Sequence, residues 1–379
     1  MITDEMPEVV WIRERFRHMG DHSGYDQLCD KLLETGQVRA FSYWRDESRK
    51  YGRRQRNLLR SLRSFANGTR FYDEHSAATE LRALRALIFR RRVAHVCYAE
   101  NNLGLLRHFK GRSALVATVH QPKGWWTEPG QWSLPRWSGG GYDLKEFFDG
   151  VDVLVALSTA SRDFLASETS GAAVFVPYGI DIDFFSPLPG DLEAAKSQAD
   201  RPSCLVVGHW LRDFPQLERI VEILSEASDE VVFDLVIPPS KTSHHVDRAS
   251  IESLLRRPNV RHHHSLSDSE LVDLYRSANL LLLPLKAASA NTAILEAMAT
   301  GLPIVSSQID GVVDYVDADC AVLTSTREPE EMSCAVLRIL SSAEVQRSMG
   351  AAARSRAVEN FSWERVAMDT LAVYERIAQ

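Results

Sequence analysis

One stretch, from Asn279 to Ser307, limits the possible folds of this chain more than any other. Its first part, Leu280 to Leu283, is a run of four apolar residues bounded by Pro284, and a second apolar run begins at Ile304. The first run suits a strand buried on both faces better than a helix, because a helix so short would not be stable alone. Strands buried on both faces belong to parallel sheets, so the stretch predicts an α/β protein.

A short helix is expected between these two strands. Apolar residues recur at roughly helical spacing over 294–302, Asn291 or Thr292 is a plausible N-cap, and Gly301 gives a stop signal. In parallel sheets, ligands bind where the carboxyl end of a strand leads into a helix N-terminus, whose free N–H groups attract phosphate. Glu296 is the one ionised side chain within this helix. From its spacing alone it is either an exposed helical carboxylate or a ligand-binding group.

The bulk properties of the chain bound its class and its compartment. The 379 residues allow two α/β domains, and the net charge of -7 opposes generalised binding to nucleic acid. No apolar segment approaches the roughly 18 to 20 residues that span a bilayer, and the N-terminus is acidic without a signal-type apolar region. The five scattered cysteines are expected to be buried small apolar residues in a reducing compartment: Cys29, Cys97, Cys204, Cys320 and Cys334. These properties predict a cytoplasmic protein.

Apolar runs and helical spacing place further elements along the chain. Helices are expected over Tyr25–Glu34, around 217–224 and over the amphipathic C-terminal segment FSWERVAMDTLAVYERI. The runs expected as strands are Val9–Ile12, Ala94–Ala99, Leu115–Val119, Val151–Ser158, Val174–Val176, Cys204–Gly208 and Val231–Ile237.

The stretch from Arg45 to Arg70 is strongly basic. Leu58, Leu59 and Leu62, with arginines at the intervening positions, predict a basic amphipathic helix. Three alternatives remain open for it. It is a solvated helix face, a surface for anionic lipid headgroups or an acidic acceptor, or a nucleic-acid site, although no recognition motif accompanies the charge. Lipid contact would place the protein peripherally at the inner face of the membrane.

His120 follows the strand expected over Leu115–Val119. A histidine just past the carboxyl end of a buried strand lies at the edge of the sheet where ligands bind. The segment after it is rich in glycine, proline and tryptophan and is expected to be a loop carrying Trp125 and Trp126. These aromatic rings are either an exposed platform for an acceptor sugar or lipid, or the packed interior of a compact lid.

Clustered histidines over 262–264 invite a metal site. On a strand, however, neighbouring side chains point to opposite faces, so no metal is expected. No organic cofactor is indicated either.

The segment LEAMATGLPIV resembles the donor-site signature of GT-B glycosyltransferases, especially retaining glycosyltransferase family 4. The resemblance implies that Glu296 hydrogen-bonds the ribose of a nucleotide sugar. The family has a second glutamate eight positions earlier, which contacts the donor sugar, and here that position is Ala288. Asn291, Thr292 or Lys286 could supply the missing contact.

The same resemblance assigns roles in the first half of the chain. Ser23 and Gly24 stand where the family has a glycine-rich loop facing the donor phosphate and the acceptor. His120, in the family's Thr-x-His context, is expected at the reaction centre against the donor sugar.

In the second half, the loop after the strand ending at Gly208 supplies an arginine and a lysine in the family. Here these positions are His209 and Phe214, which leaves Arg212 as the only cation of that loop. Arg212 is the predicted diphosphate clamp, because a guanidinium can hold phosphate through two hydrogen bonds. Asp310 and Gly311 stand where the family has Gly-Gly close to the phosphate.

The resemblance implies two Rossmann-like domains with parallel sheets facing a cleft. The expected division is an acceptor-side domain over 1–188, a linker over 189–202, a nucleotide-sugar domain over 203–360 and a C-terminal helix over 361–379 that packs back on the first domain. The implied activity is transfer of a hexosyl group from a nucleoside diphosphate sugar to an acceptor hydroxyl, with retention and without metal. The replacements at Ala288, His209 and Phe214 motivate an alternative, which is a non-catalytic sugar- or nucleotide-binding module or assembly partner.

Overall fold

The structure is a computed structural model that describes residues 6–16, 19–127, 143–188, 201–237, 247–325 and 328–378. The chain forms two compact units. The first comprises residues 1–19, 24–178 and 363–379, and the second comprises residues 20–23 and 179–362. Most of the expected linker, residues 189–200, lies outside the described residues.

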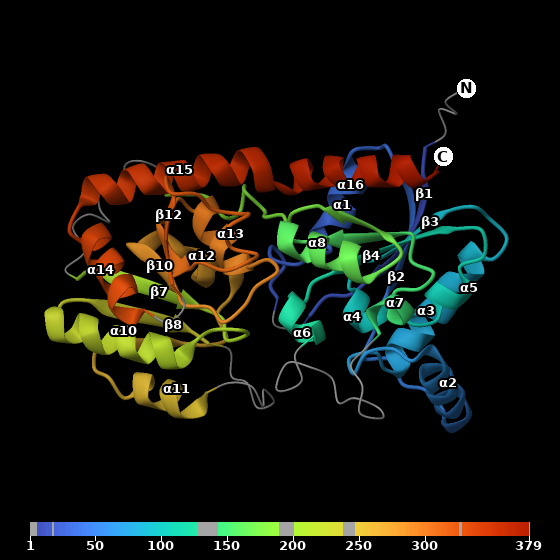
Figure 1. The fold of residues 1–379 in the computed structure, drawn as a ribbon, viewed down its shortest axis with the longest axis horizontal. Coiled ribbons are helices and arrows are strands. Elements are labelled where there is room, and N and C mark those ends of the chain that lie inside the picture. The colour runs from blue at the N-terminus through green and yellow to red at the C-terminus, as the bar shows by residue number, and fades with distance from the viewer. Residues whose placement is uncertain are drawn as a thin grey trace. The chain divides into compact units, whose positions relative to one another are not determined.

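The first unit is built on a six-stranded sheet in which every pairing is parallel, with strand order β2-β1-β3-β4-β5-β6 (Figure 1). The strands are β1 (Glu8–Arg13), β2 (Arg39–Trp44), β3 (Val93–Val96), β4 (Ala114–Val119), β5 (Val153–Ala156) and β6 (Ala172–Phe175). The predicted strands are thus confirmed, with Ala99 corrected to the start of a helix. The order reverses between β1 and β3, and such a switch point is where open parallel sheets bind ligands.

The strand β2 is one of the elements of the first unit that were not predicted. β2 is mostly exposed, so it lacks the continuous apolar run of a buried strand. It is held instead by its parallel pairing with β1 and by α3, which packs on both strands. The helices of this unit are α1 (Gln27–Glu34), α2 (Arg53–Ala66), α3 (Glu74–Leu87), α4 (Ala99–Asn102), α5 (Leu106–Phe109), α6 (Lys123–Thr127), α7 (Leu144–Phe147), α8 (Thr159–Glu168) and α16 (Trp363–Ala378).

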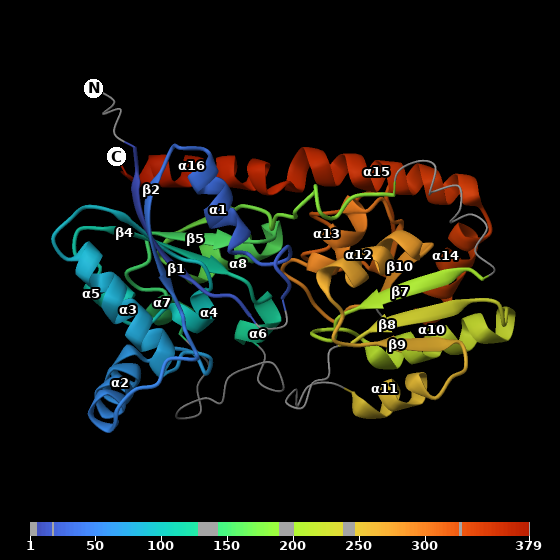
Figure 2. The same cartoon turned by 180° about the vertical axis from the view of Figure 1, so that it is seen from behind.

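The C-terminal helix α16 belongs to the first unit, as its sequence resemblance implied. It packs on α1, and Figure 2 shows the two helices together above the first sheet. Its Tyr374 hydroxyl accepts a hydrogen bond from Trp11 Nε1 of β1 at 3.0 Å. The chain therefore returns to complete the core of the unit in which it began.

The second unit repeats the architecture with strand order β12-β11-β10-β7-β8-β9, again parallel throughout. The strands are β7 (Ser203–Val207), β8 (Val232–Val236), β9 (Val260–His263), β10 (Leu280–Leu283), β11 (Ile304–Ser307) and β12 (Ala321–Thr324). β10 occupies the predicted residues. The order reverses between β7 and β10, so the loops that follow these two strands lie next to each other.

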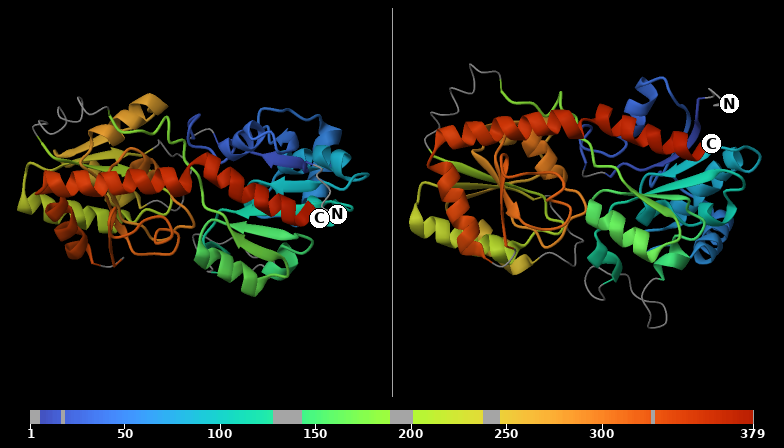
Figure 3. Two further views of the ribbon diagram at one scale, coloured as in Figure 1. Left: turned by 90° about the horizontal axis from the view of Figure 1, so that it is seen from above. Right: turned by 45° about the horizontal axis from the view of Figure 1, so that its top comes forward.

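Helices cover both faces of the second sheet (Figures 1 and 3). One core layer joins the apolar faces of α10 and α14 to alternate residues of the strands, including Leu280 and Leu282. Leu281 and Leu283 point to the other face, and all four are fully buried. The helices are α10 (Phe214–Ala227), α11 (Arg248–Leu255), α12 (Asp268–Ser277), α13 (Thr292–Ala299), α14 (Pro329–Leu340) and α15 (Ala343–Phe361).

Four of the five cysteines are buried as predicted, whereas Cys334 is exposed on α14, and the prediction for that residue is wrong. Among the described residues, no helix is long and apolar enough to cross a membrane.

Candidate functional site

In the second unit, the predicted strand, loop and helix are confirmed at the switch point of the sheet. Leu285 N–H donates to Ser307 Oγ at 2.9 Å, and Ser306 Oγ donates to Leu283 O at 2.7 Å, so β10 and β11 hold the start of the loop. Asn291 is the N-cap of α13, with its Oδ1 accepting from Ala293 N–H at 3.1 Å. Thr292 is the first helical residue.

Glu296 is buried, with 4% of its surface exposed, so it is not the solvent-facing helical carboxylate that its spacing also allowed. Tyr275 Oη donates to its Oε2 at 2.7 Å and Ser23 Oγ donates to its Oε1 at 2.9 Å. Burial raises the pKa of Glu296 to about 7, although both hydrogen bonds favour the charged form. Each carboxylate oxygen can accept a further hydrogen bond, such as one from a hydroxyl group.

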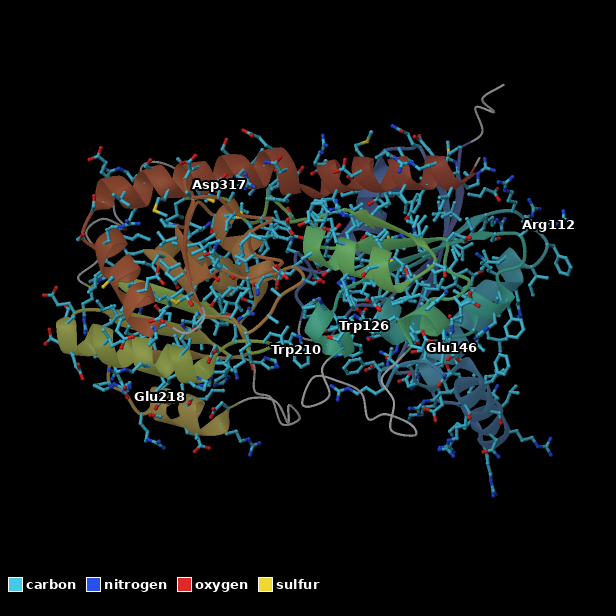
Figure 4. All side chains as sticks on the ribbon, in the orientation of Figure 1. Arg112, Trp126, Glu146, Trp210, Glu218 and Asp317 are labelled. Atoms are coloured by element: carbon cyan, nitrogen blue, oxygen red, sulfur yellow. The ribbon has the colours of Figure 1, made fainter. Side chains whose placement is uncertain are left out.

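Arg212 lies in the loop between β7 and α10, which bends through left-handed backbone at Gly208 (φ +84°) and Leu211 (φ +60°). Its Nε donates to Val207 O at 2.9 Å and its Nη1 donates to Trp210 O at 3.0 Å. Its Nη2 lies 3.5 Å from Asn291 Oδ1, the cap of α13. The guanidinium thus joins the loops of β7 and β10. Figure 4 shows Trp210 at the end of β7.

The charge of Arg212 is retained at neutral pH. Burial lowers its pKa to about 10, and nearby Tyr275 and Glu296 oppose the shift. Three of its five N–H groups are engaged within the described part of the second unit, mostly by the loop itself. Arg212 therefore shapes the loop as well as supplying a positive charge. His209, the other predicted donor-site residue of this loop, is half-buried beside it.

Gly311 packs against the backbone of the loop that follows β10. Its φ is +75°, and a Cβ there would lie 2.4 Å from Ala288 O. Glycine is required on both counts. The Asp310–Gly311 turn therefore lies beside the position where the resembled family has its first glutamate, and Ala288 itself is buried. Lys286 is exposed on the same loop.

In the first unit, His120 follows β4, as predicted. Its Nε2 lies 2.8 Å from Cys97 O, which can only accept, so Nε2 carries the proton and Nδ1 carries the lone pair. The ring stacks on Tyr98 with centroids 4.2 Å apart. Burial lowers the pKa of His120 to about 4, so the imidazole is neutral at pH 7 and Nδ1 is a hydrogen-bond acceptor.

Of the two alternatives left open for the aromatic rings after His120, the exposed platform is wrong for Trp125 and Trp126. Trp125 and Trp126 lie on the short helix α6, and only 2% and 5% of their surfaces are exposed. Trp125 stacks on Phe71, while Trp126 packs on Phe147 and Phe148. The packed alternative holds for these two residues, because both rings are buried against aromatic side chains of the first unit, within which Figure 4 labels Trp126.

Ser23 and Gly24 precede α1, as predicted, and lie on either side of the division between the units. Ser23 is bonded to Glu296 within the second unit. Gly24 O accepts from Gln27 N–H at 3.2 Å in the turn that begins α1. The assignment of both residues to a phosphate or acceptor loop stays a prediction.

Sequence reasoning missed two buried polar residues at these sites. Tyr275 was not singled out by the sequence, and only the tertiary fold brings its hydroxyl to Glu296. Glu100 was expected to follow a strand without a role, yet its Oε1 accepts from the N–H groups of His120 and Gln121, each at 2.7 Å. Among the described residues, no group of three or more His, Cys, Asp or Glu side chains could hold a metal ion.

Comparisons with known proteins agree with this architecture. The family model described as "Glycosyl transferases group 1" matches residues 216–356. The chain is 31% identical over 319 residues to an MMP alpha-(1->4)-mannosyltransferase of Mycolicibacterium hassiacum, covering 78% of this chain and 74% of that protein. It is 27% identical over 262 residues to a D-inositol 3-phosphate glycosyltransferase of Kineococcus radiotolerans, covering 62% of this chain and 59% of that protein.

Solved structures show the fold. Sucrose-phosphate synthase of Thermosynechococcus elongatus superposes with a TM-score of 0.73 at 18% identity, covering 98% of this chain and 99% of that one. HepE of Anabaena, in complex with UDP and glucose, gives 0.67 at 14% identity, covering 98% and 100%. Together with the two parallel sheets, these neighbours identify the α/β fold as GT-B. The chain therefore belongs to the glycosyl transferases group 1 family and is a GT-B glycosyltransferase of the family-4 type.

Proposed function

We propose that the enzyme transfers a hexosyl group from a nucleoside diphosphate sugar to an acceptor hydroxyl, with retention of anomeric configuration and without a metal ion. The observation that carries the donor assignment is the buried Glu296 carboxylate, which lies on α13 beside the cationic loop of Arg212 at the switch point of the second sheet. A carboxylate can accept hydrogen bonds from the hydroxyl groups of a nucleoside, and a cation next to a helix N-terminus attracts a diphosphate. The two together fit the polarity of a nucleoside diphosphate.

Three groups would stabilise the diphosphate as it becomes the leaving group. Arg212 provides positive charge, the N-terminus of α13 provides aligned N–H groups, and the Asp310–Gly311 turn provides backbone N–H groups nearby. In a site that excludes water such preorganised dipoles are effective, since they need no rearrangement as charge develops. No metal is then required for this part of the reaction.

Glu296 would hold the ribose, because the hydroxyl groups of a ribose can each donate to a carboxylate oxygen. Asn291 or Thr292 would take the contact that the missing glutamate at Ala288 leaves open. The neutral His120 would orient a hydroxyl of the donor sugar by accepting at Nδ1. The mannosyltransferase relative makes a mannosyl donor the first one to test.

A thermal-shift screen against UDP, GDP, ADP and dTDP, with and without their common sugars, tests the donor assignment. A ligand that binds only the native state at about 100 times its Kd adds about 2.7 kcal/mol of stability. We expect one nucleotide to raise the Tm and Glu296→Gln to reduce its effect. The anomeric configuration of the product, read by NMR, tests retention, and activity after chelation tests metal independence. No shift with any nucleotide would favour the non-catalytic assembly partner.

A further inference from the structure

Each unit contains a buried tyrosine whose hydroxyl donates to a buried glutamate. In the first unit Tyr72 Oη donates to Glu80 Oε2, and in the second unit Tyr275 Oη donates to Glu296 Oε2 at 2.7 Å. Both tyrosines are fully buried, and burial raises the pKa of each glutamate to about 7. The two pairs therefore allow a comparison between similar groups in similar surroundings.

The two carboxyl groups differ in the number of further donors that they meet. Glu80 also accepts from the three backbone N–H groups of residues 104–106, which gives it four donors in all. Within the described part of the chain, the Glu296 side chain accepts only from Tyr275 and from the half-buried Ser23 hydroxyl. A carboxylate offers about four lone-pair sites, so the acceptor capacity of Glu80 is used and about half that of Glu296 is left for a ligand.

Tyr275 is the more firmly held of the two donors to Glu296. It lies on α12, which begins with a capping box between Ser267 and Glu270 and packs beside α13, the helix that carries Glu296 (Figures 1 and 2). The Tyr275 ring meets that of Phe185 nearly at right angles, with centroids 6.3 Å apart. Burial raises the pKa of Tyr275 well above its usual range, so the hydroxyl keeps its proton and remains a donor.

We infer that Tyr275 is a positioning residue for the donor, which holds the Glu296 carboxylate in the orientation that accepts from the ribose hydroxyl groups. The last torsion of a glutamate side chain has a broad energy minimum, so a carboxylate keeps one orientation only when its oxygens are bonded. The inference rests on the proposed function, which assigns the ribose to Glu296. It concerns recognition of the ribose and leaves the role of Arg212 toward the diphosphate unchanged.

Tyr275→Phe removes one oxygen and keeps the ring, so the contact with Phe185 is preserved. Tyr72→Phe is the matched control, because it deletes the same hydroxyl from a similarly buried pair of tyrosine and glutamate. A general effect of losing a buried hydroxyl would appear in both variants. A positioning effect on the donor appears in Tyr275→Phe alone.

The test is calorimetric titration with UDP, GDP or ADP, whichever the thermal-shift screen identifies, and with its 2′-deoxy and 3′-deoxy analogues. We expect wild type to bind the ribonucleotide at least tenfold more tightly than one of the analogues. Tyr275→Phe should reduce this preference at least fivefold by weakening ribonucleotide binding, and Tyr72→Phe should retain it. Unchanged affinity of Tyr275→Phe for the deoxy analogue shows that the variant is folded and still binds the diphosphate.

A double-mutant cycle provides a readout that a merely structural role would not change. Tyr275 is inferred to act through Glu296, so Tyr275→Phe should cause no further loss of the preference when it is added to Glu296→Gln. A structural effect of Tyr275→Phe would weaken binding to the same extent in both backgrounds.

The positioning role is overturned if Glu296→Gln loses the preference for the ribonucleotide while Tyr275→Phe keeps it. It is also overturned by an equal loss in Tyr72→Phe, or by losses that add in the double variant. The proposed function fails in a different way. If Glu296→Gln itself keeps the wild-type preference, the ribose is not held by Glu296, and the donor assignment falls together with the inference that rests on it.

Discussion

Glu296→Gln separates the two consequences of burying a carboxyl group at the donor site. The substitution keeps the size of the side chain and an oxygen that can accept from Tyr275 or Ser23. It removes the negative charge and the titration of the group. Because only 4% of Glu296 is exposed, solvent screens these effects little.

The first consequence concerns stability against pH. The pKa of Glu296 is about 7 in the folded protein, compared with an ordinary value of 4.5. Between these values the folded state holds a proton that the unfolded state has lost, so wild-type stability falls as pH rises through this window. The fall amounts to about 3 kcal/mol, at 1.36 kcal/mol for each pH unit. Glu296→Gln lacks this contribution, so its free energy of unfolding relative to wild type should rise by about 3 kcal/mol from pH 4.5 to 7.5.

The second consequence concerns nucleotide affinity. Hydrogen bonds to a charged group contribute about 1.5–3 kcal/mol, and the amide replaces one ribose acceptor with a donor, so we expect a loss of about 2 kcal/mol, or about 30-fold in Kd. Denaturant unfolding across pH and calorimetric titration with the nucleotide found in the screen measure the two effects. Glu80→Gln should change stability with pH but not affinity. Unchanged affinity in Glu296→Gln would refute the ribose assignment, and a pH-independent stability difference would refute the burial argument.

Three further predictions follow from named contacts. Asn291→Ala removes the cap of α13, which typically costs about 1 kcal/mol, and should lower the Tm by about 2–4 °C as well as weakening nucleotide binding, measured by melting with and without ligand. His120 has a folded pKa of about 4 instead of 6.5, so wild-type stability should fall as pH drops through this window, and His120→Gln should remove about 3 kcal/mol of that fall in acid unfolding curves. If its role is only structural, turnover per folded molecule will not change. The protein should sediment more strongly with vesicles containing anionic lipid than with neutral vesicles, and alanine at Arg53, Arg54 and Arg56 should weaken sedimentation, whereas the same loss of charge away from α2 should not.

The fold could largely be predicted because its strongest signals are local. The four consecutive apolar residues Leu280–Leu283 indicate a strand that is buried on both faces. The N-cap and stop signals of α13 come from residues at the two ends of the helix itself. β2 had no such signal. Its apolar and polar residues do not alternate regularly. Its place at the edge of the sheet depends on pairing with β1, a contact between segments about 30 residues apart.

The candidate sites were predicted less completely, since their chemistry depends on burial and on distant partners. The resemblance indicated Glu296, but its raised pKa comes from the surrounding structure. Glu100 had no sequence signal, since neither its hydrogen bonds to the turn after β4 nor its open oxygen can be read from spacing. The tryptophan-rich segment left an exposed platform and a packed lid open as alternatives, because composition does not distinguish an exposed ring from a buried one.

The basic stretch 45–70 shows that a run of basic residues in a sequence does not by itself form a basic surface in the folded protein. Arg45, at its start, is only 8% exposed and lies 2.5 Å from Glu14 Oε1, with Glu47 and Asp73 as further ion-pair partners. These carboxylates neutralise its charge inside the first unit, so the charge is not available to an external anion. On α2 the opposite holds. The helix rests on the unit through Leu59 and Ala66, its arginines are exposed, and Leu58 and Phe65 are more than half exposed, at 56% and 57%.

An exposed helix with arginines and large apolar side chains differs from an ordinary solvated face. Arginines alone would bind any polyanion, but the exposed Leu58 and Phe65 side chains add binding free energy only where they can bury apolar surface. A lipid surface with anionic headgroups offers both, since each basic residue near it contributes about 1 kcal/mol and the apolar side chains can enter the boundary of the acyl layer. High salt should therefore weaken vesicle binding without abolishing it, whereas binding to a soluble polyanion through α2 would be lost completely. Complete loss of vesicle binding at high salt would show that the apolar side chains make no contribution.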